Sequence, residues 1–173
     1  MIGVLVCISA CHKPHLHTDA VTDRASMPVL DGTNVTTLIS DSGITRYRIK
    51  TARWQVYDKA EPPYWEFKEG IYLERFDEQL NVNAWLQSDY AKYDEQAQIW
   101  HLTGNVHAMN MEGEQFETPE LYWNQTTEKV YSDSVITITR EASIIKGVGF
   151  ESNQEMTKYT IRKPTGIFPL KDE

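Results

Sequence analysis

The sequence predicts an all-β protein of the sandwich or barrel type, on three observations. Apolar and polar side chains alternate with a period of two, most clearly where Trp100 and Leu102 alternate with His101 and Thr103. Turn-forming residues interrupt this alternation at 41–43, 61–63, 77–79, 112–114 and 124–127. Aromatic residues make up 11% of the chain and favour sheets. No stretch keeps the helical period of 3.6 residues.

Residues 1–10 are the first expected element, a secretory signal peptide. They are apolar from Ile2 to Ala10, and a run of about ten residues is too short for a bilayer core, which needs about 20. The residues Ile8-Ser9-Ala10-Cys11 resemble a bacterial lipobox. This resemblance implies cleavage before Cys11, a diacylglycerol on its sulfur and a second attachment on its new amino group. Cys11 is then the lipid anchor. The alternative is an apolar N-terminus without processing.

Residues 11–33 are expected to tether this anchor to the folded domain, because they are polar and keep no sustained period. His12, His15 and His17 lie close together in this segment, and a metal site is one interpretation. Imidazoles on a tether lack the surrounding contacts that orient metal ligands, so incidental binding or no role is favoured. The signal and the anchor account for both cysteines. We therefore expect no disulfide and no cofactor.

Residues 34–173 are expected to form one β domain, in line with the number of domains that this chain length favours. Turn residues divide the domain into a series of short segments with the composition of strands. The expected strands are 34–40, 44–57, 64–76, 81–93, 98–110, 115–123, 128–139, 143–150 and 156–162.

A loose internal repeat runs through this domain. An apolar residue, a polar residue and Ser or Thr recur as Ile49-Lys50-Thr51, Leu86-Gln87-Ser88, Phe116-Glu117-Thr118 and Phe150-Glu151-Ser152. Further apolar residues follow each copy, such as Leu121 and Trp123 after the third and, less clearly, Met156 after the fourth. A period of roughly 30 to 37 residues with two strands per unit predicts stacked hairpins that share one core. The alternative is chance similarity among strands rich in Thr and aromatic residues.

One unit resembles the OstA/LptA-type repeat, in which an Ala-Asp-x-Ala strand turns into a strand ending Leu-x-Gly-Asn-Val. Here residues 88–91 (Ser-Asp-Tyr-Ala) match the first half and residues 102–106 (Leu-Thr-Gly-Asn-Val) match the second. Together with residues 38–49 and 64–77, the order of the motifs resembles the LptC family over about residues 34–166. LptC is the periplasmic, inner-membrane-anchored component of the lipopolysaccharide export machine. Many members use an N-terminal transmembrane helix, where this chain offers a lipid anchor.

The resemblance implies a twisted, V-shaped antiparallel β-jelly roll that is open at both ends. Its apolar interior is expected to take the acyl chains of lipopolysaccharide from the ABC transporter and to pass them to LptA at the C-terminal edge. LptF and LptG are expected at the N-terminal edge, and both joints would be strand additions to exposed sheet edges. The expected place is the periplasmic face of the inner membrane of a Gram-negative bacterium, with acylated Cys11 as the anchor. ATP hydrolysis belongs to LptB, so this chain should bind no nucleotide.

The groove wall is expected to be a spread of apolar side chains rather than one specific pocket, because transported lipid must also be released. The candidates are Leu38, Ile49, Trp54, Phe67, Ile71, Leu73, Trp100, Leu102, Val106, Ile136 and Ile138. The alternative for each is a core residue that contacts protein alone. Phe67 is the strongest candidate, because it matches an aromatic of the family pattern.

The partner edges are the second expected site. The candidate residues are Thr36, Leu38, Gly147, Gly149, Tyr159 and Ile161. The two glycines are expected to allow a bend near the C-terminal edge, and a simple turn or bulge without a partner is the alternative.

The charge balance excludes other classes of partner. The chain has 17 Lys and Arg against 25 Asp and Glu, which gives a net charge of −8 and a pI near 5.1. A nucleic-acid partner requires a positive surface, and so does simple adhesion to anionic lipid headgroups. A lipid partner must therefore be held mainly by its apolar part.

No enzyme activity is expected, because the sequence lacks the motifs of catalysis. It contains no Gly-rich phosphate loop, no His-x-x-x-His and no Gly-x-Ser-x-Gly. His101 and His107 share one face of an expected strand, but solvated surface histidines are favoured over a zinc pair. Asp77 and Glu78 lie in an expected turn, where solvated charges are the ordinary finding.

Two other functions stay open beside the lipid conduit: a structural β-scaffold lipoprotein that assembles through its edges, and a glycan-binding surface lipoprotein. A conduit predicts an apolar interior continuous with open ends. A scaffold predicts a closed core filled by side chains. Glycan binding predicts exposed coplanar aromatic rings on one outer face.

Overall fold

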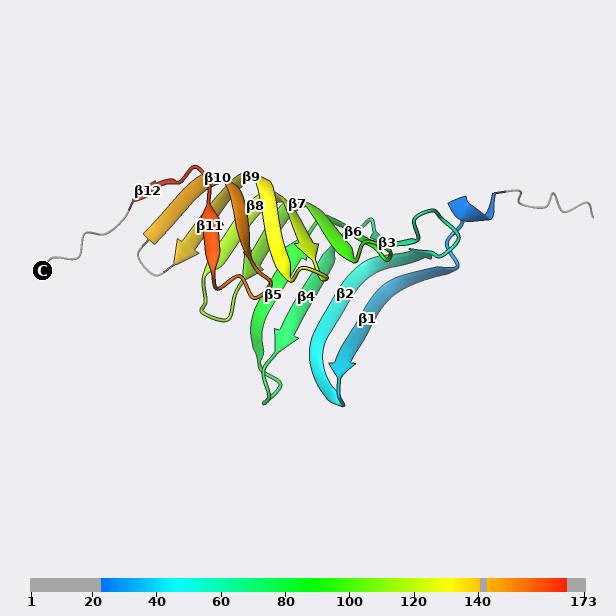
Figure 1. Ribbon diagram of the computed structural model, residues 1–173. Helices are drawn as coiled ribbons and strands as arrows, with labels where there is room; N and C mark the ends of the chain where they lie inside the picture. Colours follow the sequence, from blue (N-terminus) through cyan, green and yellow to red (C-terminus); the bar gives the residue numbers. More distant parts are fainter. Residues whose placement is uncertain (1–22, 141–142, 168–173) are drawn as a thin grey trace, which may run out of the picture.

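The computed structural model describes residues 23–140 and 143–167 (Figure 1). The expected signal peptide, the expected anchor Cys11 and most of the expected tether lie outside the described residues. The described part is an antiparallel sheet of 12 strands, preceded by the short 3₁₀ helix η1 (Arg24–Ser26). The strands are β1 (Leu30–Asp41), β2 (Ile44–Tyr57), β3 (Tyr64–Phe67), β4 (Ile71–Phe76), β5 (Val82–Ser88), β6 (Tyr90–Asp94), β7 (Ile99–Met109), β8 (Gln115–Asn124), β9 (Lys129–Arg140), β10 (Ser143–Asn153), β11 (Tyr159–Ile161) and β12 (Thr165–Ile167). The all-β prediction is confirmed.

Two of the expected strands are divided in the structure. The expected strand 64–76 is β3 and β4, because Gly70 has a positive φ of 84° and ends the extended conformation between them. The expected strand 81–93 is β5 and β6, which are separated at Asp89. The two breaks lie together, since a Cβ atom on Gly70 would be 2.8 Å from the carbonyl oxygen of Ser88. Both breaks send consecutive strands into different halves of the sheet.

The sheet folds into two halves. In the first half-sheet, β4 and β5 pair with the first part of β2 and the last part of β7. In the second half-sheet, β3 and β6 pair with the last part of β2 and the first part of β7. The long strands run through both halves and bend between them, as Figure 1 shows for β1 and β2. This arrangement is the jelly-roll-like fold that the sequence predicts.

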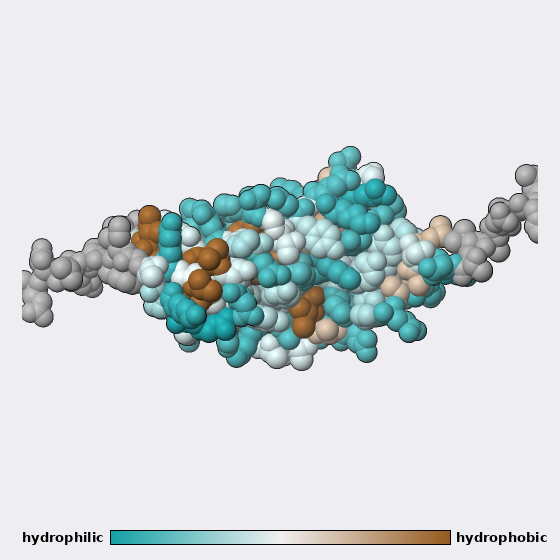
Figure 2. All heavy atoms as spheres, turned by 90° about the horizontal axis from the view of Figure 1, so that it is seen from above, coloured by the Kyte–Doolittle hydropathy of each residue, from teal (hydrophilic) through white to brown (hydrophobic). Residues whose placement is uncertain are grey.

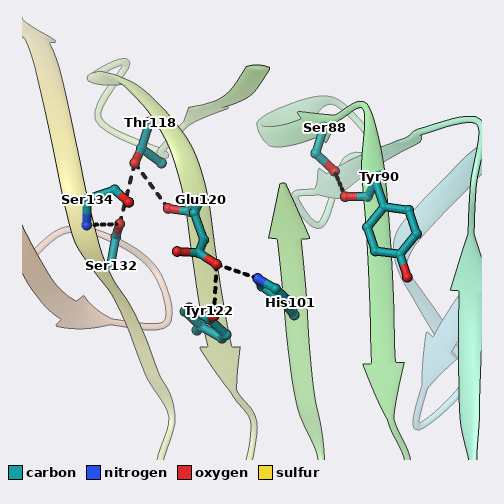
Figure 3. Close-up of polar contacts among 8 residues, drawn as sticks. All are labelled: Ser88, Tyr90, His101, Thr118, Glu120, Tyr122, Ser132 and Ser134. Carbon is teal, nitrogen blue, oxygen red and sulfur yellow. Dashed lines mark hydrogen bonds and ion pairs between the residues drawn. The ribbon is translucent and has the colours of Figure 1, made fainter. Parts of the chain in front are cut away.

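Buried hydroxyl groups mark the bends, and they belong to the third residue of the sequence repeat. Thr51, Ser88 and Thr118 each donate a hydrogen bond of 2.9–3.0 Å to the carbonyl oxygen two residues further along, as Figure 3 shows for the last two. A hydroxyl in this position satisfies a backbone carbonyl where the strand ladder is interrupted. Ser152 differs, because it bonds to the carbonyl oxygen of Asn153 at the end of β10. The repeat therefore places the same hydrogen bond in β2, at the end of β5 and in β8.

Side chains fill the core between the half-sheets near the bends. Phe67, Phe116 and Phe150 are each less than 2% exposed. The rings of Trp54, Phe67 and Trp100 stack in a column, with centroid distances of 5.8 and 5.6 Å. Aromatic rings at such distances attract one another beyond the effect of burial alone. This part of the interior is closed.

The sheet ends in two different edges. At one end, β1 pairs with β2 and with no other described strand. At the other end, β11 and the unexpected strand β12 both pair with β10, and the chain crosses between them over Gly147 and Gly149. A Cβ atom on Gly147 would lie 2.2 Å from Cγ2 of Ile161, and one on Gly149 would lie 2.2 Å from Nε of Arg162. Only glycine leaves room for this crossing.

Candidate functional site

An apolar crevice lies between the two half-sheets, on the side away from the bends. Its volume is about 100 Å³. Both halves contribute side chains to it, and most of these are apolar. The lining residues are Tyr47, Leu73, Arg75, Ala84, Trp85, Leu86, Ala108, Met109, Asn110, Met111, Leu121, Trp123, Val130, Gln154, Glu155 and Met156. Four polar or charged residues also line the crevice. They are Arg75 on β4, Asn110 after β7, and Gln154 and Glu155 in the turn between β10 and β11.

Strand register forms the walls of this crevice, because residues directly opposite each other in an antiparallel pair point to the same face. One row crosses the first half-sheet and consists of Ile49, Leu73, Leu86, Ala108 and Phe116. The other row crosses the second half-sheet and consists of Trp65, Tyr93, Trp100, Trp123 and Val130. The members of these rows that line the crevice are Leu73, Leu86 and Ala108 on one side and Trp123 and Val130 on the other, and the remaining members lie in the core or against it. Neither row contains a charged residue.

The expected groove-wall residues fall into three groups. Leu73 lines the crevice itself. Ile49, Phe67, Ile71, Trp100, Leu102, Val106, Ile136 and Ile138 belong to the buried core, and Trp54 packs against it. Leu38 is not brought together with the others, because it is paired with Arg48 and so lies on the opposite face of the sheet from Ile49; it is 58% exposed.

Three indole N–H groups of the interior have no hydrogen-bond acceptor among the described residues. They are the Nε1 atoms of Trp54, Trp100 and Trp123, and all three are buried. A buried donor without a partner costs about 1–3 kcal/mol, and folded proteins contain few of them. Of these three tryptophans, Trp123 is the one that lines the crevice.

The family to which this chain belongs follows from a comparison with known protein families. The family model described as "LptC: Lipopolysaccharide-assembly, LptC-related" matches residues 2–163, which is most of the chain. The chain belongs to the LptC family. It is therefore a component of lipopolysaccharide transport in the bacterial envelope, and the family is not known for enzymes. A comparison with curated proteins found no match. No helix in the described part of the chain has the length and hydropathy of a membrane span.

Sequence reasoning missed several crevice residues of this LptC-family chain, above all Leu86, Trp123 and Met156. Leu86 could have been predicted from the sequence, because it has the same position in the repeat as Ile49 and Phe116. These two residues lie in the same row across the first half-sheet. Trp123 follows the third copy of the repeat in the same way. Met156 lies in a turn, whereas the sequence predicts that it begins the strand 156–162; β11 begins only at Tyr159. Its burial depends on packing that the local sequence does not indicate.

The N-terminal edge of the LptC-family sheet is longer than the sequence indicates. β1 begins at Leu30, ahead of the expected start at residue 34. Thr36 and Leu38 lie on this strand, and both are exposed. The outer side of β1 has no strand partner among the described residues, so its backbone groups are available for pairing.

The C-terminal edge is tied to the rest of the sheet through a buried carboxylate. Tyr159 on β11 donates a hydrogen bond of 3.1 Å to Glu114, which also accepts one from the side chain of Asn110. Burial raises the pKa of Tyr159, so its phenol stays protonated and able to donate. Ile161 lies on the same strand, whereas Gly147 and Gly149 lie on β10 beneath the crossing chain.

The outer face of the second half-sheet carries a stacked row of rings from His101, Tyr122 and Tyr131. Their planes are nearly parallel, at interplanar angles of 3° and 12° and centroid distances of 4.4 and 5.3 Å (Figure 3 labels the first two). Rings stacked in this way cover each other's faces, and the residues opposite the two ends of the row in the strand register are Lys92 and Glu151. A sugar needs an exposed ring face, so this row does not form the platform that glycan binding predicts. In the view of Figure 2, hydrophobic residues appear as separate spots on a largely hydrophilic surface.

The surroundings of Glu74 predict how the free energy of unfolding depends on pH. The Glu74 side chain is 8% exposed and forms ion pairs with Arg48 and, at 3.3 Å, with Lys50. The hydrogen bond from Arg48 lowers the pKa of Glu74 below its ordinary value of 4.5. A carboxyl whose pKa is lower in the folded state stabilises the protein above the pKa of the unfolded state, and this contribution is lost as the pH falls through the folded-state value.

We therefore expect the free energy of unfolding to decrease as the pH falls below about 4.5, with part of the decrease absent in Glu74→Gln. Urea unfolding between pH 7 and pH 3 measures this difference. Glu128→Gln makes the same change of charge at an exposed turn residue and serves as the control. Parallel pH profiles for the unmodified chain and Glu74→Gln would contradict the assignment.

Proposed function

We propose that this chain is the bridge of the lipopolysaccharide exporter on the periplasmic side of the inner membrane. It takes the acyl chains of lipopolysaccharide from the ABC transporter and passes them to LptA. The observation that carries this proposal is the crevice between the half-sheets, which is lined by Leu73 and Leu86 on one side and by Trp123 on the other. Family membership supports the lipid class.

The chemistry of the crevice suits hydrocarbon that must be bound and then released. Each buried CH₂ group contributes about 0.8 kcal/mol, so several methylenes are held without any ion pair. The apolar rows run across successive strands, which offers an acyl chain a continuous surface rather than one deep site.

The two edges of the sheet suit partners that add strands. β1 offers the N-terminal edge, with Thr36 exposed on it, to LptF and LptG. β11, with Tyr159 and Ile161, offers the C-terminal edge to LptA. Strand addition at both ends would continue one groove through several proteins, because backbone hydrogen bonds align the neighbouring sheets. Acylated Cys11 would hold the chain at the inner membrane.

Photo-crosslinking in cells tests this proposal. A photoreactive residue at Leu86 should form adducts with lipopolysaccharide that disappear when ATP is depleted. The control is Gln87, the next residue of β5, which is exposed and points to the opposite face. Adducts at Leu86 and none at Gln87 are the expected result. If the folded and anchored protein forms no adduct at Leu86, the proposal of a lipid conduit is wrong and a structural scaffold is favoured. Adducts at Gln87 alone would favour binding of glycan on the outer face.

A further inference from the structure

One side chain that lines the crevice, Met156, comes from a turn rather than from a strand. We propose that Met156 fills the crevice in the unloaded protein and that the turn of residues 153–158, between β10 and β11, moves away when an acyl chain enters. This inference rests on the proposed function, because it assumes that the ligand is an acyl chain. It adds a movable wall to a crevice whose other walls are mostly strands.

Met156 is buried although it lies in a turn. Its side chain is 7% exposed, belongs to the core and lines the crevice. Its φ of 56° is in the left-handed region, which glycine and asparagine favour. Gln98 and Glu128 have nearly the same φ in other hairpin turns, at 55° and 54°, but both are exposed. The turn that carries Met156 therefore differs from its counterparts in directing an apolar side chain to the interior.

The crevice is smaller than pockets that hold small organic ligands, so we expect part of its wall to move when an acyl chain enters. The crevice volume of about 100 Å³ is well below the roughly 300–1,000 Å³ of such pockets. Leu73, Leu86, Trp123 and Val130 lie on strands that are hydrogen-bonded to neighbours on both sides. Moving these residues would break ladders, whereas a surface turn moves at smaller cost. The turn that carries Met156 is thus the wall that gives way.

The hydrogen bonds of the turn allow it to move as one unit. The side chain of Asn153 accepts hydrogen bonds of 3.0 Å from the backbone N–H groups of Thr157 and Lys158, so the turn holds its own shape. The backbone N–H of Met156 bonds to the carbonyl oxygen of Asn153 within the same turn. Across the crevice, Nδ2 of Asn110 donates a hydrogen bond of 2.9 Å to the carbonyl oxygen of Met156. Moving the turn breaks this contact with Asn110 and withdraws the Met156 side chain from the core, while the hydrogen bonds within the turn are kept.

The test compares lipopolysaccharide adducts at Leu86 in variants of the full chain. Met156→Ala should raise the adduct yield about threefold or more. In the unmodified chain only the small fraction of molecules with the turn displaced can bind, which lowers the apparent affinity in proportion to that fraction. Removing the Met156 side chain removes this limit. Met156→Phe should lower the yield, because the larger side chain fills the crevice further. Met27→Ala is the control, since Met27 is 48% exposed and does not line the crevice, and we expect it to leave the yield unchanged.

A second measurement uses the unmodified sequence and so does not depend on how the variants fold. The full chain is labelled with ¹³C on its methionine methyl groups and titrated with lipopolysaccharide, and the Met156 signal is assigned by its loss in Met156→Leu. We expect the Met156 methyl signal to shift and that of the exposed Met27 to stay.

The outcomes separate this inference from the proposed function. Equal adduct yields in all variants with an unmoved Met156 signal would overturn the movable turn and leave the conduit in place. No adduct at Leu86 in either the unmodified chain or Met156→Ala would overturn both.

Discussion

Leu73→Asp is expected to lower the yield of lipopolysaccharide adducts at Leu86 about tenfold, with the fold retained. An aspartate in the hydrocarbon core of a membrane costs about 3 kcal/mol, which corresponds to roughly a hundredfold in affinity. The crevice is partly open to water, which reduces this cost, so we expect about a tenfold effect. Leu73 faces Leu86 across the β4–β5 pair, so the new carboxylate would lie where the acyl chain packs.

Val135→Asp is the matched control for this change. It introduces the same charge on β9, outside the crevice and both edge strands, at a position that is 59% exposed. We expect adducts at Leu86 to form as in the unmodified chain. Thermal unfolding of both variants establishes that they fold. Unchanged adducts in folded Leu73→Asp would rule out the side of the crevice lined by Leu73 and Leu86 as the lipid path.

Phe67→Ala is expected to reduce the free energy of unfolding by about 3–5 kcal/mol, which is the usual cost of removing a buried phenylalanine ring. Phe67 is fully buried, with an exposed fraction of 0%, and it stacks between Trp54 and Trp100. Removing its ring leaves a cavity that strands of a hydrogen-bonded sheet cannot close by small shifts. Urea unfolding, monitored by tryptophan fluorescence, measures the change.

Val135→Ala provides the comparison, because Val135 is 59% exposed on β9. Exposed positions of this kind change stability by about 0.5 kcal/mol or less. A cost below about 1.5 kcal/mol for Phe67→Ala would mean that the site collapses or fills with water, and that the inner part of the interior is open rather than packed.

The strands followed from the sequence because their signals are local. Alternation of side chains reflects the pleat of one strand, and the turn clusters reflect the backbone preferences of a few residues. Two expected strands are divided in the structure, at Gly70 and Asp89, and the local sequence did not predict these breaks. Each break separates strands that pair with different halves of the sheet, and this choice depends on partners far away along the chain.

The candidate groove was predicted in part. Alternation groups the residues that share a face but does not indicate which face is inside, and Leu38 shares its face with Arg48. The core residues Phe67 and Trp100 were assigned to the wall because an apolar side chain is compatible with either role. The structure separates the closed inner part from the open crevice beside Leu86.

The sequence by itself determined that this protein is all-β, that turn residues divide it into short strands, and that a triplet ending in Ser or Thr recurs along it, as at Thr51 and Thr118. These properties follow from residue types and their spacing. The tertiary structure alone decided that Leu73 and Leu86 on one side and Trp123 and Val130 on the other line a narrow crevice, and that Met156 lines it as well. The reason is physical: both depend on which segments pack together across the fold, and a packing partner distant in sequence leaves no mark on the local pattern.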